Sequence, residues 1–259
     1  MLANDDLLLL FDVDGTLVAG ATKAHAEALV TALREVHGLD EIRSTAVLGI
    51  EPAGRTDPEI ARLMLLAHGI SADRIDARAA RVREVCCETY ARICPPDLSD
   101  TVLPGVAPML ERLAARDGAV PALLTGNYEP VARVKLRAAR IGRWLAPGEG
   151  AFGSDSEDRT DLPAIARARA GHALLGGAGG ATEGGTSSRG GVADHEPHPR
   201  ERTIVIGDTP RDIACAQVDG VRCLAVATGN FTTAQLLAAG ADWAVSDAAE
   251  LGKRIDALL

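Results

Sequence analysis

The chain has 259 residues, 47% of them hydrophobic and 24% charged, which is typical of a soluble globular protein with a sizeable core. Its formal net charge of −9 argues against a nucleic-acid or anionic-membrane partner, although local cations can still bind a phosphorylated ligand. No stretch approaches about 18 apolar residues, and the apolar run near the start follows two aspartates, a poor secretory signal. The five cysteines form no CxxC pair, so we expect reduced thiols in a cytoplasmic protein.

The first apolar run ends in a pair of acids. Residues 7–11 read LLLLF, typical of a strand buried on both faces, and Asp12 and Asp14 follow at once. Two carboxylates two residues apart point to one side of an extended chain, and open α/β sheets bind ligands beyond the carboxyl ends of their strands. An EF-hand calcium loop would need Glu at its twelfth position, where Lys23 stands. A plain Asp-Gly turn is the alternative.

Helical patterns follow, without a strand pattern among them. The apolar spacing predicts three helices, over 21–37, 58–68 and 72–93. We therefore predict an all-helical domain over 18–100, inserted after the first strand of a core made of 1–17 and 101–259. Arg55, Thr56 and Asp57 lie in a loop after Gly54 that could reach the binding crevice, where Arg55 would suit a substrate carboxylate. A solvated turn and helix cap is the alternative.

Strands and helices alternate after residue 101. Apolar runs predict strands over 120–124, 203–206, 223–227 and 243–245. Helical patterns lie between them, including 106–116, 162–170 with Asp161 as N-cap, and segments that begin near Pro130, Pro210 and Asp247. This alternation predicts an α/β fold with a Rossmann-like parallel sheet and helices on both faces.

A Gly-rich stretch over 171–200 interrupts the alternation. Its composition cannot build a core, so we expect a flexible insertion within the core domain. His195 and His198 lie in this stretch, and we expect them to be solvated rather than to bind a metal.

Three predicted strands end in side-chain oxygens. They are followed by Asp12 and Asp14, by Thr125, and by Asp208, with Asp212 four residues later. Because parallel strands end at one edge of a sheet, we expect these side chains to meet there. Such close carboxylates repel one another, and an all-oxygen ligand set favours Mg²⁺ over Zn²⁺. One or two of these acids, Asp208 among them, could instead cap helices.

A phosphoryl group is the natural ligand of such a site. The Thr125 hydroxyl and nearby backbone N–H groups could hold its oxygens. One carboxylate could attack the phosphorus, while a second protonates the leaving oxygen and then deprotonates water. A cation is also needed. Arg159 is the best-placed candidate. Lys135 is the other candidate, although we expect a lysine in the middle of a helix to be exposed to solvent.

The ordered set FDVDGT, LLTGN, a downstream basic residue and VIGDTPRD resembles the motifs of the haloacid dehalogenase superfamily, in its phosphatase branch, over nearly the whole chain. The resemblance implies that Asp12 is the nucleophile and Asp14 the general acid and base. It also implies Mg²⁺ held by Asp12, the Asp14 carbonyl and Asp208, with Asp212 in support.

The same resemblance implies substrate contacts in the second motif and a basic residue in the third. The substrate contacts would come from Thr125, with Gly126 and Asn127 of the same turn. Arg159 stands at the third motif, where the family usually has Lys followed by Pro. The helical insertion resembles the C1 cap, which covers the site and selects substrates.

We therefore expect a Mg²⁺-dependent phosphatase that acts on a small phosphorylated metabolite and resembles the phosphoglycolate phosphatases. Dehalogenating members of the family lack an acid at the position of Asp14. Phosphonate-cleaving members use a cap lysine, and only Lys23 is a lysine in this insertion. A sugar phosphomutase keeps both aspartates and is an alternative, as is a non-catalytic binding protein on this fold.

Overall fold

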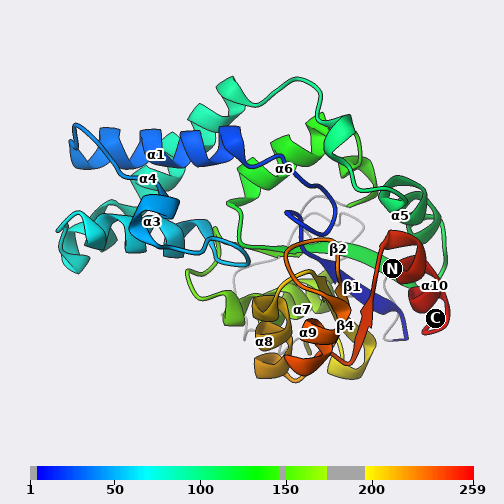
Figure 1. Cartoon of the computed structure of the whole chain (residues 1–259). Coiled ribbons are helices and arrows are strands. Elements are labelled where there is room, and N and C mark those ends of the chain that lie inside the picture. The colour runs from blue at the N-terminus through cyan, green and yellow to red at the C-terminus, as the bar shows by residue number, and fades with distance from the viewer. Residues whose placement is uncertain (1–4, 146–149, 174–195) are drawn as a thin grey trace, which may run out of the picture.

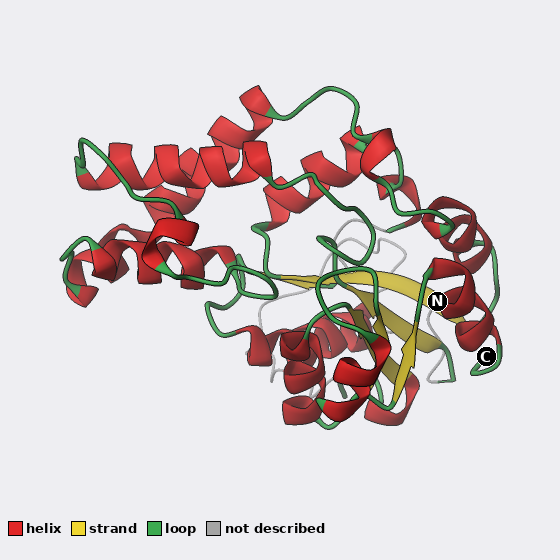
Figure 2. Ribbon diagram, in the orientation of Figure 1, coloured by secondary structure: helices red, strands yellow, loops and turns green. Residues whose placement is uncertain are grey.

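The computed structural model describes residues 5–145, 150–173 and 196–259. In these ranges a parallel sheet with flanking helices forms one half of the molecule, and helices alone form the other (Figure 1, Figure 2). The strands are β1 (Leu7–Phe11), β2 (Ala119–Thr125), β3 (Ala151–Phe152), β4 (Thr203–Gly207), β5 (Arg222–Val226) and β6 (Trp243–Val245). The helices are α1 (Lys23–His37), α2 (Thr45–Leu48), α3 (Asp57–Ala67), α4 (Ala72–Ile93), α5 (Val106–Ala114), α6 (Glu129–Ala138), α7 (Leu162–Ala173), α8 (Pro210–Asp219), α9 (Thr233–Ala238) and α10 (Ala248–Asp256).

The six described strands lie in the order β3-β2-β1-β4-β5-β6, and every pair is parallel. β1 is central, with Leu9 in register with Pro121 of β2 and with Ile204 of β4. The direction in which the chain adds strands reverses beside β1. Ligands bind at such a switch point, beyond the carboxyl ends of the strands.

The continuous apolar run of β1 is buried because helices cover both faces of the sheet. Leu7, Leu9 and Phe11 pack in one cluster with α5 and α10. Leu8 and Leu10 pack in the opposite cluster with α7, α8 and α9. The predicted α/β fold, with a parallel sheet, helices on both faces and a helical insertion after the first strand, is confirmed.

The helical insertion has an apolar core of its own. α1 packs along α4, and Leu29, Leu33 and Met64 are buried between the helices (Figure 1). Tyr128 and Val131, at the start of α6, join this cluster and so connect the insertion to the sheet half. Among the described helices, none is long and apolar enough to cross a membrane.

Several local features differ from the sequence-based expectations. α2, α9 and the two-residue β3 were not predicted, because each is too short for a periodic pattern. The turn before α7 is capped by Asp158, which accepts the Thr160 N–H, whereas Asp161 lies inside that turn and bonds Ser156.

The Gly-rich stretch 171–200 falls largely outside the described residues, and so does His195. Residues 171–173 continue α7. The expectation that His198 is solvated is wrong. His198 is buried, its backbone N–H donates to the Arg167 carbonyl (2.9 Å), and its Nε2 lies 3.1 Å from the Arg202 carbonyl.

Candidate active site

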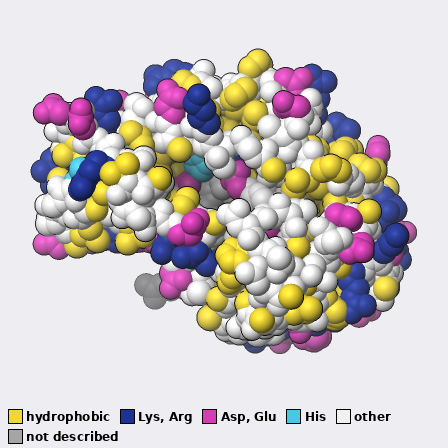
Figure 3. Space-filling view, viewed as in Figure 1, with side chains coloured by type: hydrophobic (Ala, Val, Ile, Leu, Met, Phe, Trp, Pro, Cys, Tyr) yellow, Lys and Arg dark blue, Asp and Glu magenta, His cyan; other side chains and the backbone are white. Residues whose placement is uncertain are grey.

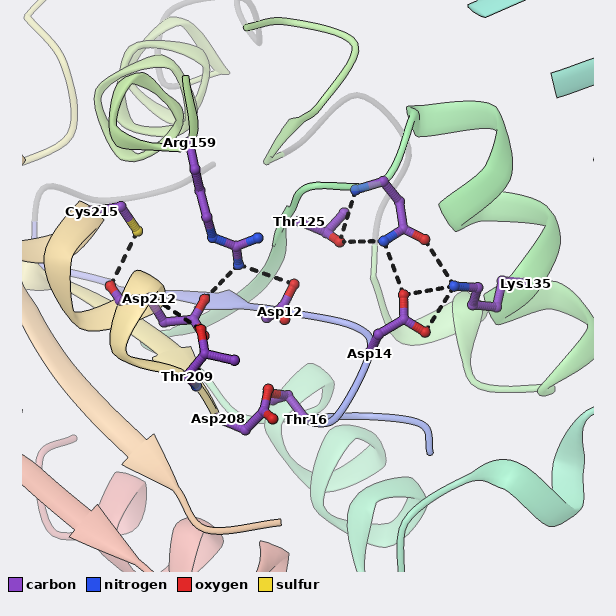
Figure 4. Close-up of polar contacts among 11 residues, drawn as sticks. Asp12, Asp14, Thr16, Thr125, Lys135, Arg159, Asp208, Thr209, Asp212 and Cys215 are labelled. Atoms are coloured by element: carbon purple, nitrogen blue, oxygen red, sulfur yellow. Dashed lines mark hydrogen bonds and ion pairs between the residues drawn. The ribbon is translucent and has the colours of Figure 1, made fainter. Parts of the chain in front are cut away.

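Three carboxylates from two strand ends meet at the switch point. Asp12 directly follows β1, where its N–H donates to the Ile206 carbonyl of β4 (2.8 Å). Asp208 directly follows β4, and Asp212 lies in the first turn of α8. All three side chains are buried, and one oxygen from each lies within 4.8 Å of the others (Figure 4).

The electrostatics of this cluster fit a divalent cation. Burial raises the pKa of Asp208 to about 8, and the charges of Asp12 and Asp212 add to the rise. Burial likewise raises the pKa of Asp12 to about 6, although the Arg159 guanidinium opposes it. A divalent ion would offset both the burial of these charges and the repulsion that adds to it, and hard carboxylate oxygens are the donors that Mg²⁺ prefers. The three acids could therefore bind a metal.

The Asp208 carboxylate lies in a narrow cradle of backbone. A Cβ added to Gly15 or Gly229 would overlap it, and Gly15 has a φ of +89°, which favours glycine. The Thr16 hydroxyl donates to Asp208 (3.3 Å), and the Thr228 hydroxyl donates to the Gly15 carbonyl (2.5 Å). The loop after β1 can therefore pass directly against the acid that follows β4.

Arg159 is the cation of this cluster. Its buried Nη2 lies 3.2 Å from Asp12 Oδ1 and 2.5 Å from Asp212 Oδ1. Asp212 also accepts the Thr209 N–H (3.0 Å) and hydroxyl (2.7 Å), forming a capping box at the start of α8. The expected alternative of a helix-capping acid therefore applies to Asp212, which also faces the site. Asp208 does not cap α8, because Thr209 is the N-cap.

Asp14 points away from the three-acid cluster, toward α6 (Figure 4). Lys135 Nζ donates to both Asp14 oxygens (2.8 and 2.7 Å) and to Asn127 Oδ1 (2.9 Å), and Asn127 Nδ2 donates to Asp14 (2.9 Å). Burial alone would raise the pKa of Asp14, but Lys135, His25 and Asn127 together hold it below its usual value. The expectation that Lys135 is a solvated side chain is wrong, since its exposure is 0%.

The turn after β2 lies between the sheet and the insertion. The Thr125 hydroxyl is buried and accepts the backbone N–H (3.3 Å) and the side-chain N–H (3.1 Å) of Asn127. Gly126 lies against the backbone of Arg55 and Thr56. The Arg55 guanidinium pairs with Glu59 and donates to the Glu51 carbonyl (2.9 Å), so in this arrangement it does not contact the acids.

His25 was missed by sequence reasoning, and for Asp57 the sequence indicated only a loop that could reach the site. His25 of α1 and Asp57 of α3 form a buried contact (Nε2 to Oδ2, 3.0 Å) beside the turn after β2. Neither belongs to a recognisable motif, and the sequence holds no signal that pairs them. In Figure 3 a hollow opens between the helical insertion and the sheet half, and acidic side chains and a histidine are visible in it.

One family model matches most of the chain. A family model described as haloacid dehalogenase-like hydrolase matches residues 9–217. No curated protein sequence matches the chain. Solved structures resemble it over nearly its whole length, at sequence identities that show the fold alone.

Three of these solved structures show the sequence identity, coverage and TM-score of the resemblance. A predicted phosphoglycolate phosphatase from Haemophilus somnus is 19% identical, with 98% of this chain and 100% of that one covered and a TM-score of 0.60. A predicted phosphatase from Clostridium acetobutylicum is 15% identical, with coverages of 97% and 99% and a TM-score of 0.60. CbbY from Rhodobacter sphaeroides, in complex with xylulose-(1,5)bisphosphate, is 20% identical, with coverages of 95% and 96% and a TM-score of 0.56.

Proposed function

Because this chain belongs to the haloacid dehalogenase-like hydrolases, we propose that it is a Mg²⁺-dependent phosphatase that hydrolyses a small phosphomonoester through an aspartyl phosphate. The observation that carries the proposal is the convergence of Asp12, Asp208 and Asp212 at the sheet edge. Asp14 follows on the same loop as Asp12, with its side chain turned toward Lys135. Asp12, Asp208 and Asp212 would hold the Mg²⁺, which would supply positive charge against the phosphoryl oxygens.

Asp12 is the proposed nucleophile. Its carboxylate oxygen attacks phosphorus, an acyl-phosphate bond forms, and the bond from phosphorus to the ester oxygen breaks. Arg159 contacts Asp12 and is the side chain best placed to bind a phosphoryl oxygen during this step. Thr125, Gly126 and Asn127 are proposed to bind the other phosphoryl oxygens from the turn after β2.

Asp14 is the proposed acid and base. It gives a proton to the ester oxygen as the alcohol leaves, and it then removes a proton from the water that attacks the acyl phosphate. Hydrolysis releases inorganic phosphate and restores the Asp12 carboxylate. Leaving groups that depart as stable anions depend less on this proton, because their oxygen carries the charge without it.

The test is phosphate release from p-nitrophenyl phosphate and from a panel of metabolite phosphomonoesters, with Mg²⁺ and with EDTA. We expect Mg²⁺-dependent turnover that Asp12→Asn abolishes. Absence of turnover by the folded protein between about pH 5 and 9, where acid–base groups of this kind act, would contradict the proposal. Isomerised product with little free phosphate would instead identify a sugar phosphomutase.

A further inference from the structure

One residue of the helical insertion contacts the turn after β2 at two points. The Asp57 backbone N–H donates to the Gly126 carbonyl (2.8 Å), and its Oδ2 accepts the Tyr128 backbone N–H (2.7 Å). These two bonds enclose Asn127, whose side chain contacts both Asp14 and Lys135. Asp57 is therefore bonded on both sides of the residue that links the proposed acid to its cation.

The Asp57 carboxylate is buried, with only 3% of the residue exposed. Its second partner is His25 of α1, also in the insertion, at 3.0 Å, and the His25 ring stands edge-on to Tyr90 at 5.7 Å. A buried carboxylate needs such partners, because it has lost its hydration. The insertion therefore holds the Asp57 carboxylate in place as a hydrogen-bond acceptor for the core.

This acceptor satisfies the start of α6. The first N–H groups of a helix have no partner within the helix, and the N-cap residue Tyr128 supplies no side-chain cap. Asp57 accepts the Tyr128 N–H, and Ser154 Oγ accepts the Glu129 N–H (2.8 Å). A carboxylate at this end of a helix also interacts favourably with the helix dipole. The helix so capped carries Lys135.

Two glycines allow the backbone of the insertion to lie close to the turn after β2. A Cβ on Gly126 would overlap the Arg55 carbonyl, and a Cβ on Gly153 would overlap the Gly126 carbonyl. Thr56, the residue before Asp57, also donates its hydroxyl to the Glu157 carbonyl of the core (2.6 Å). The loop of the insertion can therefore lie directly on the turn.

We propose that Asp57 is a positioning residue that couples docking of the helical insertion to the alignment of Asn127 and Lys135, with His25 holding its carboxylate in place. When the insertion docks, the Tyr128 N–H gains the Asp57 carboxylate as its acceptor. When the insertion lifts, the Tyr128 N–H and the Gly126 carbonyl, which flank Asn127, lose their hydrogen bonds to Asp57. The kinetic consequence rests on the proposed phosphatase function, whereas the docking contact does not.

The first test is amide hydrogen exchange, which needs no substrate. In Asp57→Ala we expect the Tyr128 amide to exchange at least about tenfold faster, as for loss of a hydrogen bond to a charged group, with β4 amides unchanged. Asp57→Asn keeps an acceptor oxygen and should restore most of the protection. Asp73→Ala is the matched control, since Asp73 is an exposed acid in the first turn of α4.

The second test is turnover of p-nitrophenyl phosphate with Mg²⁺. We expect kcat of Asp57→Ala to fall about tenfold, in step with exchange, while thermal stabilisation by Mg²⁺ is unchanged because the three-acid cluster is intact. Wild-type exchange or kcat in this variant, or acceleration that spreads to β4 or recurs in Asp73→Ala, would overturn the coupling. Faster exchange in a protein that hydrolyses nothing would support the docking contact and remove the proposed function.

Discussion

Replacing Lys135 with Met tests the ion pair between Lys135 and Asp14. Met retains much of the length and apolar volume of the Lys side chain but removes the ammonium group. Three hydrogen bonds are lost, two to Asp14 and one to Asn127. The change leaves a partly buried carboxylate without the cation that faces it.

The expected loss of stability follows from burial. Breaking a buried ion pair costs about 3–5 kcal/mol, because the remaining charge is uncompensated. Here 25% of the Asp14 side chain is exposed to water, so we expect the free energy of unfolding to fall by only about 2–3 kcal/mol. For a chain of this size, that corresponds to a fall in Tm of roughly 4–12 °C.

The pH dependence has a defined sign. Lys135 lowers the folded-state pKa of Asp14 against the effect of burial, and such a carboxyl adds stability above its ordinary pKa and loses it as pH falls through the folded value. The loss of stability in Lys135→Met, relative to the wild type, should therefore be largest near neutral pH and become smaller in acid. Thermal unfolding of wild type, Lys135→Met and the exposed-site control Lys253→Met measures it. Equal Tm values for both variants at neutral pH would refute the reasoning.

Four further outcomes are expected. Asp208→Asn should abolish the rise in Tm that Mg²⁺ gives the wild type, and an undiminished rise would exclude Asp208 as a ligand. Because burial raises the pKa of Asp12 to about 6 and that of Asp208 to about 8, Mg²⁺ affinity measured by calorimetry should increase from about pH 5 to 8 as these protons leave, while the metal-free protein loses stability over the same range. Arg55→Ala should shift relative kcat/KM across a panel of phosphate esters more than Mg²⁺ affinity, and an equal loss on every ester would count against a role in selection. Asp14→Asn should reduce kcat/KM about 10²–10⁴-fold on alkyl phosphates and less on p-nitrophenyl phosphate, and equal losses would argue against proton donation.

The sequence located the sheet and the edge at which the acids meet, because both depend on local patterns. The run at residues 7–11 is typical of a strand covered on two faces, and strands in parallel order bring Asp12 and Asp208 to one edge. The environment of each acid depends on helices far along the chain. No local pattern could show that Arg159 reaches Asp12 while Asp14 turns to α6.

Lys135 shows where a usable signal was overlooked. Val131, Ala132, Leu136 and Ala138 of α6 are buried, and Lys135 lies four residues after Val131 and three after Ala132. A lysine in phase with the apolar stripe of a helix needs a buried partner, which the periodicity alone could have indicated. The two-residue β3 and the His25–Asp57 contact left no comparable pattern, because their partners are set by tertiary packing.

Asp12 and Asp14 are two residues apart, and each faces a different cation. Arg159 faces Asp12 from the turn before α7, and Lys135 faces Asp14 from α6. Burial still raises the pKa of Asp12 although Arg159 opposes it, whereas Lys135 and its neighbours hold the pKa of Asp14 below its usual value. Under the proposed function, a phosphoryl group that reached the Lys135 ammonium from the turn after β2 would compete with Asp14 for its hydrogen bonds. Each hydrogen bond that Lys135 gives to the phosphoryl group is withdrawn from Asp14, and the pKa of Asp14 then rises toward that of a proton donor. Binding of the substrate would in this way prepare the acid that its leaving group needs.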